Sequence, residues 1–299
     1  MSPRHFLDLS EIGKESLRDI LAHAHQMKKS KFSPPQLLSG LSLAMVFDKK
    51  STRTRISFEV AMKQLGGHII VMGMDEIQLS GAESIEDTAE VLSRFVDGAM
   101  IRMSDHDILV NLSKHSRIPV INGLTDHSHP CQIMADLMTI EEKIGPVAGK
   151  RVAWFGDYNN VARTWAQAAK LLDFEMVASV PEHLSKQDTS TSVTFTQSPK
   201  EAALNADVVV TDTWVSMGQE GKNDDVFRPY QVTSDLMSHA KDSVIFMHCM
   251  PVHRGHEVTE DVLRSPACVI YDEAENRLHA QKAILAWSLQ DAGVTLSAN

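Results

Sequence analysis

The sequence predicts an α/β protein of two domains, each a parallel sheet flanked by helices, with the active site in the cleft between them. Short apolar runs alternate with segments whose apolar residues recur at helical spacing, a pattern typical of βαβ units. A breaker cluster at Gly145–Lys150 separates two such series. We therefore expect domains at 1–145 and 146–272, with a C-terminal helix at about 273–299 that packs back on the first domain.

The first domain is expected to begin with one helix over Leu9–Met27, from the spacing of its apolar residues. Ser84, followed by Glu86 and Asp87, looks like a capped helix start, and Pro130 occupies a favoured first-turn position. The other predicted helices span 52–65, 84–95 and 130–144, and the predicted strands span 41–47, 68–72, 98–102 and 118–123.

The second domain repeats the alternation with five predicted strands. They span 151–155, 175–180, 193–197, 207–211 and 243–247, with helices at 161–172, 199–206 and 233–240 and a terminal helix at 273–292. In parallel sheets ligands bind outside the carboxyl ends of the strands. Polar residues that directly follow a strand are therefore the candidates for function.

Composition excludes several classes of protein. The 299 residues carry a net charge of −10, which argues against a broad nucleic-acid or anionic-membrane surface. The three cysteines are odd in number and far apart, which suits a reducing compartment. The N-terminus has no apolar signal region, and no uncharged run approaches the ~18 residues of a membrane span. We expect a cytoplasmic protein that binds neither nucleic acid nor membrane.

Ser51-Thr52-Arg53-Thr54-Arg55 lies between a buried strand and the start of a helix. Backbone N–H groups at a helix N-terminus favour an anion, and arginine adds a planar fork that matches phosphate. The alternative is a Ser/Thr N-cap followed by solvated arginines. Spacing alone does not separate the two interpretations.

Four more places hold polar residues near the end of a predicted strand: Arg102, His129 with Gln132, Asp212, and His248-Cys249-Met250-Pro251. Arg277, on the terminal helix, adds a fifth. Each also has a structural explanation, such as a surface ion pair for Arg102 or an inert buried thiol for Cys249. Together they suit transfer of an acyl-type group from a phosphate to an amine, with a donor such as His129 stabilising an oxyanion. No metal-ligand spacing is evident, and we expect no metal and no cofactor.

The motifs, in this order, resemble the aspartate/ornithine carbamoyltransferase family over essentially the whole chain. The Ser-Thr-Arg-Thr stretch and His129-Pro130-Cys131-Gln132 are shared across the family. Asp212 with Ser216-Met217-Gly218, together with His248-Cys249-Met250-Pro251, resembles the ornithine branch. Glu275-Asn276-Arg277-Leu278-His279 completes the set. Met250 stands where the family commonly has leucine, an adaptable exchange.

The resemblance implies a role for each matching residue. Carbamoyl phosphate would be bound by Ser51, Thr52, Arg53, Thr54, Gln78, Arg102, His129, Pro130, Cys131, Gln132, Cys249, Met250 and Arg277, with Gln78 reaching a neighbouring subunit's site. Ornithine would be bound by Asn160, Asp212, Ser216 and Met217. The catalytic residues would be Arg102, His129, Gln132, Asp212 and Cys249.

The implied reaction moves the carbamoyl group of carbamoyl phosphate to the δ-amine of L-ornithine, giving citrulline and phosphate in arginine metabolism. Carbamoyl phosphate would bind first, followed by domain closure in a homotrimer or trimer of trimers. Three alternatives are a carbamoyltransferase for a modified amine such as N-acetylornithine, a non-catalytic binding homologue, and a nucleotide-binding oxidoreductase. The last is disfavoured because Phe155–Asn160 has one glycine where a dinucleotide turn needs several.

Overall fold

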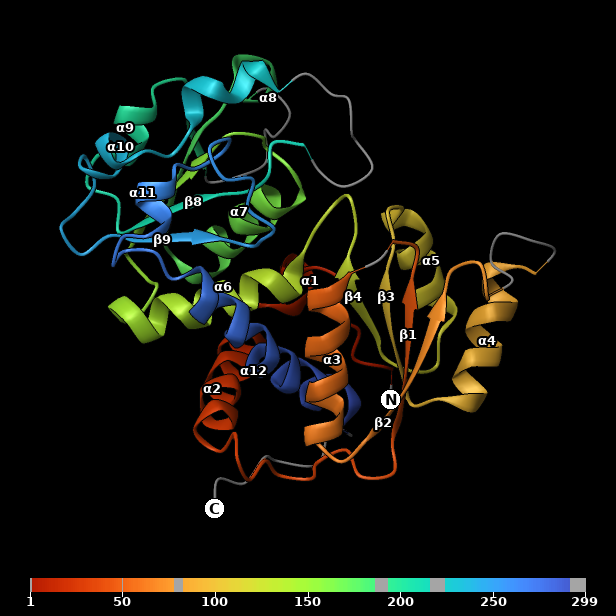
Figure 1. The fold of residues 1–299 in the computed structure, drawn as a ribbon. Helices are drawn as coiled ribbons and strands as arrows, with labels where there is room; N and C mark the ends of the chain where they lie inside the picture. The colour runs from red at the N-terminus through yellow and green to blue at the C-terminus, as the bar shows by residue number, and fades with distance from the viewer. Residues whose placement is uncertain (1, 50, 78–82, 186–192, 216–223, 291–299) are drawn as a thin grey trace. The chain divides into compact units, whose positions relative to one another are not determined.

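The computed structural model describes residues 2–49, 51–77, 83–185, 193–215 and 224–290 (Figure 1). The chain divides into two compact units, Met1–Met134 with Arg277–Asn299, and Ala135–Asn276. Two helices, α6 (Pro130–Ile144) and α12 (Ile270–Leu289), each have residues in both units. Among the described residues, every helix is too short or too polar to cross a bilayer.

The first unit contains a four-stranded parallel sheet, as predicted. The strands are β1 (Ser42–Phe47), β2 (His68–Gly73), β3 (Gly98–Arg102) and β4 (Val120–Leu124), in the order β2-β1-β3-β4. The chain moves outward from β1 to β2 and then returns to the other side of β1. The topological switch point therefore lies between β1 and β3, where open α/β sheets bind ligands.

The described helices of the first unit that precede α6 are α1 (Leu9–Ile12), α2 (Lys14–Lys29), α3 (Thr52–Gln64), α4 (Ile85–Phe95) and α5 (His106–His115). The prediction of one helix over Leu9–Met27 is wrong, because Gly13 adopts φ 81° and interrupts it. The capped start of α4 is confirmed, since Ser84 Oγ accepts from the Asp87 N–H at 3.0 Å. Helix α5 was not predicted.

One face of this sheet is covered by α4 and α5 (Figure 1). Alternate residues of the strands point to it, among them Ala44 and Val46 of β1 and Ile101 of β3, and they pack with Leu109 and Leu112 of α5. This apolar layer fixes the strands, so the residues just beyond their carboxyl ends are held on a rigid frame.

The second unit contains a five-stranded parallel sheet, again as predicted. Its strands are β5 (Arg151–Phe155), β6 (Glu175–Ser179), β7 (Val193–Thr196), β8 (Val208–Thr211) and β9 (Ile245–His248), in the order β7-β6-β5-β8-β9. All neighbours are parallel. Here the switch point lies between β5 and β8.

The described helices of this unit that follow α6 are α7 (Asn160–Leu172), α8 (Glu182–Ser185), α9 (Pro199–Ala203), α10 (Ser234–Met237) and α11 (Glu260–Leu263), with a 3₁₀ turn at Asp225–Tyr230. Helices α9, α10 and α11 gather on one side of the sheet (Figure 1) and share a core with Phe155 and Phe246. The last helix, α12, begins at Ile270 rather than at 273, and residues 291–299 lie outside the described part.

Candidate functional site

The N-terminus of α3 stands at the switch point of the first sheet. Ser51 occupies the N-cap position with extended backbone (φ −148°), yet its side chain makes no capping hydrogen bond. The Ser51 side chain therefore does not accept from the N–H groups of the first turn, which point out of the helix end, where an anion binds best. This observation favours the anion site over the simple N-cap that the sequence left open.

A chain of buried polar side chains converges on Thr54, in the first turn of α3. Arg102, the last residue of β3, donates from Nη1 to Thr54 Oγ1 at 3.1 Å. Arg277 donates from Nη2 to the same oxygen at 3.4 Å and from Nη1 to Gln132 Oε1 at 2.5 Å. All four side chains are less than 10% exposed. Two guanidiniums are thus held side by side at the edge where the parallel strands end.

His129 lies beside these guanidiniums, just before α6, and is 4% exposed. Burial, followed by the charges of Arg277, Arg102 and Arg53, holds its pKa well below the ordinary 6.5. The imidazole is therefore neutral at neutral pH. A neutral imidazole near cationic groups can orient a polar ligand without adding another positive charge to the site.

The two residues that follow His129 are buried. Pro130 opens α6, as predicted. Cys131 is fully buried, its thiol donates to the Asn122 carbonyl of β4 at 3.3 Å, and burial raises its pKa to about 12. Its sulfur is an inert packing group rather than a nucleophile.

In the second unit, Asp212 stands one residue beyond β8 and meets two partners. The Cys249 thiol, one residue beyond β9, donates to Oδ1 at 3.0 Å, and Asn159 Nδ2 donates to Oδ2 at 2.8 Å. Asn159 Oδ1 in turn caps α7 by accepting from Val161 N at 3.0 Å and Ala162 N at 3.2 Å. The carboxylate is 8% exposed and is therefore fixed in direction.

The Cys249 thiol stays protonated. Its pKa is raised well above the ordinary value, first by burial and next by the negative charge of Asp212. A thiol that donates to a carboxylate is a poor nucleophile, but the pair offers a buried negative charge with a soft, adjustable neighbour. Such a pair can hold an amine or an ammonium.

The backbone after β9 is held by a buried polar network. His248 Nδ1 accepts from the Met250 N–H at 2.9 Å, so the ring proton lies on Nε2, which donates to Glu257 Oε1 at 3.2 Å. Glu257 Oε1 also accepts from His253 N at 2.5 Å. Both His248 and Glu257 are completely buried, and Met250 has φ 57°. The network therefore fixes the direction in which Cys249 points.

Some predicted residues fall elsewhere. Gln78, Ser216 and Met217 lie outside the described residues. Asn160 is the first residue of α7, and its carbonyl accepts from Thr164 Oγ1 at 2.7 Å. It is the neighbouring Asn159 whose side chain meets Asp212.

Sequence reasoning assigned no role to Asn159, to the His248 side chain or to Glu257. The only signal for Asn159 was its position as an N-cap residue directly before α7. Nothing in the sequence pairs His248 with Glu257.

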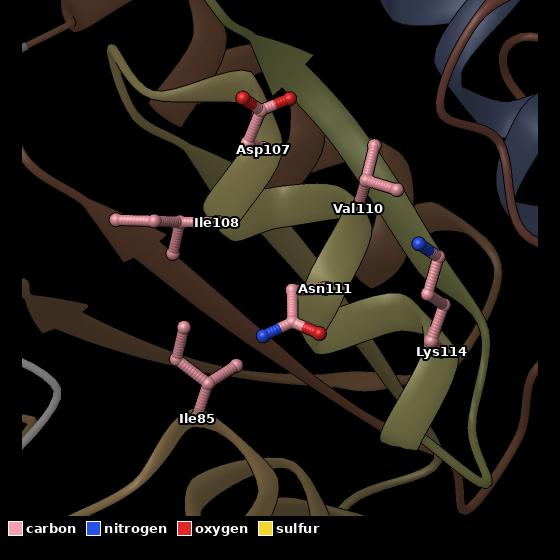
Figure 2. A pocket seen from close by; sticks show the side chains of 6 residues that line it. All are labelled: Ile85, Asp107, Ile108, Val110, Asn111 and Lys114. Carbon is pink, nitrogen blue, oxygen red and sulfur yellow. The ribbon is translucent and has the colours of Figure 1, made fainter.

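Spatial clusters of metal-ligating groups occur at two places in the described part of the chain. One joins Asp212, His248 and Cys249, and the other joins Asp8, His106 and His127. A separate hollow of about 430 Å³ lies against α5, lined by Ile85, Asp107, Ile108, Val110, Asn111 and Lys114 (Figure 2). None of the predicted site residues lines it.

Comparison with known families assigns both halves of the chain. Residues 4–142 match the family model described as "Aspartate/ornithine carbamoyltransferase, carbamoyl-P binding domain", and residues 148–288 match "Aspartate/ornithine carbamoyltransferase, Asp/Orn binding domain".

Individual relatives agree over nearly full length. The chain is 51% identical to the ornithine carbamoyltransferase of Mesorhizobium japonicum, covering 97% of this chain and 99% of the relative. It is 50% identical to that of Nitrobacter winogradskyi, covering 98% and 99%. The solved structure of the Pyrococcus furiosus ornithine carbamoyltransferase superposes with a TM-score of 0.91 at 45% identity, covering 98% of this chain and 99% of that one.

Proposed function

The chain belongs to the aspartate/ornithine carbamoyltransferase family, and we propose that it transfers the carbamoyl group of carbamoyl phosphate to the δ-amine of L-ornithine, giving L-citrulline and phosphate. The observation that carries the proposal is the partly buried Asp212–Cys249 pair. The pair offers a negatively charged site for an amine one residue beyond β8, at the switch point of the second sheet. Arg102 and Arg277 offer a positively charged site for an anion at the edge of the first sheet.

Carbamoyl phosphate is assigned to the edge of the first sheet. The phosphate binds the first-turn N–H groups of α3 together with Ser51, Thr52, Arg53 and Thr54, because the helix dipole and the guanidinium both favour a dianion. Arg102, His129 and Gln132 hold the carbamoyl group. Arg277, already bonded to Gln132 and Thr54, and the backbone at Pro130 and Cys131 complete the set, to which we add Gln78 from a neighbouring subunit and the backbone of Cys249 and Met250.

Ornithine is assigned to the edge of the second sheet. Asp212 and Cys249 orient the δ-amine, with the carboxylate fixed by Asn159 and the thiol by the His248 network. Asn160, Ser216 and Met217 hold the α-amino and carboxylate end.

The chemistry is direct transfer. The neutral δ-amine attacks the carbamoyl carbon, and the carbonyl oxygen gains negative charge in a tetrahedral intermediate. The C–O bond to phosphate then breaks, and the proton lost by the amine passes to the departing phosphate. Arg102 and His129 donate to the developing oxyanion, which lowers the barrier where the charge forms. Positioning supplies the rest, because two bound reactants need no further loss of translational freedom.

The domain bounds and the assembly are further parts of the proposal. We assign carbamoyl phosphate to residues 1–145 with the helix from about 273, and ornithine to 146–272. We further propose a cytoplasmic homotrimer or trimer of trimers, which light scattering after size-exclusion chromatography tests directly. A monomer would contradict it.

Citrulline formation tests the function. We expect turnover with carbamoyl phosphate and L-ornithine, and none when N-acetylornithine or L-aspartate replaces ornithine. Activity only with the acetylated amine would overturn the assignment of substrate. A second readout is thermal stability, which carbamoyl phosphate should raise and NAD should leave unchanged, because only a ligand of the folded state stabilises it.

A further inference from the structure

A second group of polar side chains lies at the carboxyl edge of the first sheet, away from the β1/β3 switch point. Asp8, His106 and His127 come from three segments that are far apart in sequence, and one ligand atom from each lies within 4.8 Å of the others. None of the three belongs to the substrate sites assigned above. From this geometry we propose that Asp8, His106 and His127 bind a transition-metal ion of the zinc class.

The sheet brings the three residues together. Phe6 pairs with Ile121 of β4 as a short parallel extension, through Phe6 N to the Val120 carbonyl at 2.8 Å, so Asp8 stands just beyond a strand-like end. His106 follows β3 and His127 follows β4. Carboxyl ends of adjacent parallel strands meet at one edge of the sheet. The same arrangement gathers the side chains of the anion site.

The geometry is close to what a metal needs. Asp8 Oδ2 lies 3.3 Å from His127 Nε2, the separation of two ligands about 2.1 Å from a tetrahedral ion. The His106 and His127 rings stack with centroids 4.5 Å apart. Small rotations of the two rings close the remaining distance, and the exposed side of His127 leaves room for a water ligand.

The environment of Asp8 is a second, independent reason to expect a bound cation. Its side chain is only 7% exposed, and Oδ1 is buried with no hydrogen-bond partner among the described residues. A buried carboxylate oxygen without a donor is costly, and a metal ion would relieve that cost.

The surroundings also favour a cation. His106 Nδ1 hydrogen-bonds Thr125 Oγ1 at 2.9 Å, the kind of outer contact that orients a metal-bound imidazole. Asp105 and Asp107 add negative charge near the ring.

Binding would tie the N-terminal segment to the turn that leads into the site. The turn closes through Thr125 N to the Ser128 carbonyl at 3.0 Å, and His129 follows it directly. A metal at His127 would therefore stiffen the segment that positions His129. The expected role is structural, since the three ligands touch neither substrate.

The experiment titrates Zn²⁺ into the full chain by calorimetry, and Co²⁺ by visible absorption. A Cys249→Ser background removes the thiol from the other metal-ligating cluster. We expect one Zn²⁺ per chain, a rise in Tm with Zn²⁺, and a Co²⁺ spectrum of nitrogen and oxygen ligands without a thiolate band.

His127→Gln should weaken binding tenfold or more, about 1.4 kcal/mol, and abolish the rise in Tm. Asp8→Asn should do the same, but His127 is half exposed, so its variant tests the site even if the Asp8 variant fails to fold. His115→Gln is the matched control, because His115 lies 3.4 Å from Glu86 and is similarly exposed, but belongs to no three-ligand cluster among the described residues. Unchanged Zn²⁺ affinity in His127→Gln, or no stoichiometric binding to the parent, would overturn the proposal.

Discussion

The thiol of Cys249 donates a hydrogen bond to Oδ1 of Asp212 across 3.0 Å. These residues directly follow two adjacent strands, β9 and β8, and each side chain changes what the other can do. Burial and then the carboxylate raise the pKa of the Cys249 thiol and keep it protonated, and the sulfur occupies one of the four lone-pair directions of the carboxylate. The pair is therefore built to receive an amine rather than to attack a substrate.

Replacing Cys249 should lower kcat/KM for ornithine and leave the affinity for carbamoyl phosphate unchanged. Removing one hydrogen bond to a charged group costs about 1.5–3 kcal/mol, so Cys249→Ala should lower kcat/KM for ornithine by about 10- to 100-fold. Cys249→Ser keeps a hydrogen-bond donor and should lower kcat/KM for ornithine by a smaller factor. Steady-state kinetics with each substrate varied in turn measures both effects.

Carbamoyl phosphate affinity from calorimetry is the companion measurement for the Cys249 variants. It should stay within a few-fold of the parent for both. A covalent role for the sulfur would instead abolish turnover in both variants alike, and that outcome would contradict the proposed direct transfer.

How far the sequence predicted this site depends on which contacts are local. Arg102, His129, Asp212 and Cys249 could be named because each ends a strand or comes shortly after one, and parallel strands place such residues at one edge. The sequence left two interpretations of Ser51, an N-cap or part of an anion site, and the absence of a capping hydrogen bond from its side chain favours the second.

The contacts that sequence could not give depend on strand order. Asn159 contacts Asp212 because β5 lies next to β8. The order of strands in the sheet, β7-β6-β5-β8-β9, differs from their order along the chain and could not be predicted from it. Likewise, Asp8 meets His127 only because Phe6 pairs with β4. Helix α5 was missed although Asp105 caps it, since its apolar residues span barely two turns.

Arg53 and Arg55 make a matched pair for testing the anion site. Both side chains are exposed on α3, but the charge of Arg53 acts on His129, whereas Arg55 Nε lies 3.9 Å from Glu59. Arg53→Ala should weaken carbamoyl phosphate binding by about 10- to 100-fold through loss of a charge-assisted contact.

Arg55→Ala should leave carbamoyl phosphate binding nearly unchanged, since an exposed i,i+4 ion pair contributes little. Calorimetry with carbamoyl phosphate on both variants compares them directly. Equal affinities for the two variants would remove Arg53 from the phosphate site.

The environment of His129 makes the stability of the fold depend on pH. Because its pKa is lowered in the folded state, the unfolded chain binds more protons once the pH falls below about 6.5. The free energy of unfolding should therefore decrease from about pH 6.5 downward, and the His129 contribution should be fully present above that value. His5 and His106, whose pKa values are also lowered, act in the same direction.

Urea unfolding at several pH values isolates the part due to His129. His129→Gln should flatten the decline below pH 6.5, whereas His115→Gln, on an exposed face, should keep the parental slope. A parental slope in His129→Gln would mean that this imidazole titrates normally in the folded protein.

Variants of Glu257 can distinguish a role in the stability of the fold from a role in the amine site. It accepts from His248 Nε2 and from His253 N inside a fully buried network. Glu257→Ala leaves a buried ring N–H without an acceptor and should cost about 3 kcal/mol in unfolding free energy. Glu257→Gln retains a carbonyl oxygen in the same place and should cost clearly less.

Kinetics then show what the Glu257 network is for. Because His248 also accepts from Met250 N, loosening Glu257 should let the segment that carries Cys249 shift. We expect Glu257→Gln to raise KM for ornithine while carbamoyl phosphate affinity stays at the parental value. Glu260→Ala, which breaks only exposed ion pairs with Arg254 and Arg264, should change neither Tm nor KM. If Glu257→Gln lowered Tm but left the ornithine KM untouched, the network would serve the fold alone, because Cys249 would then keep its direction without it.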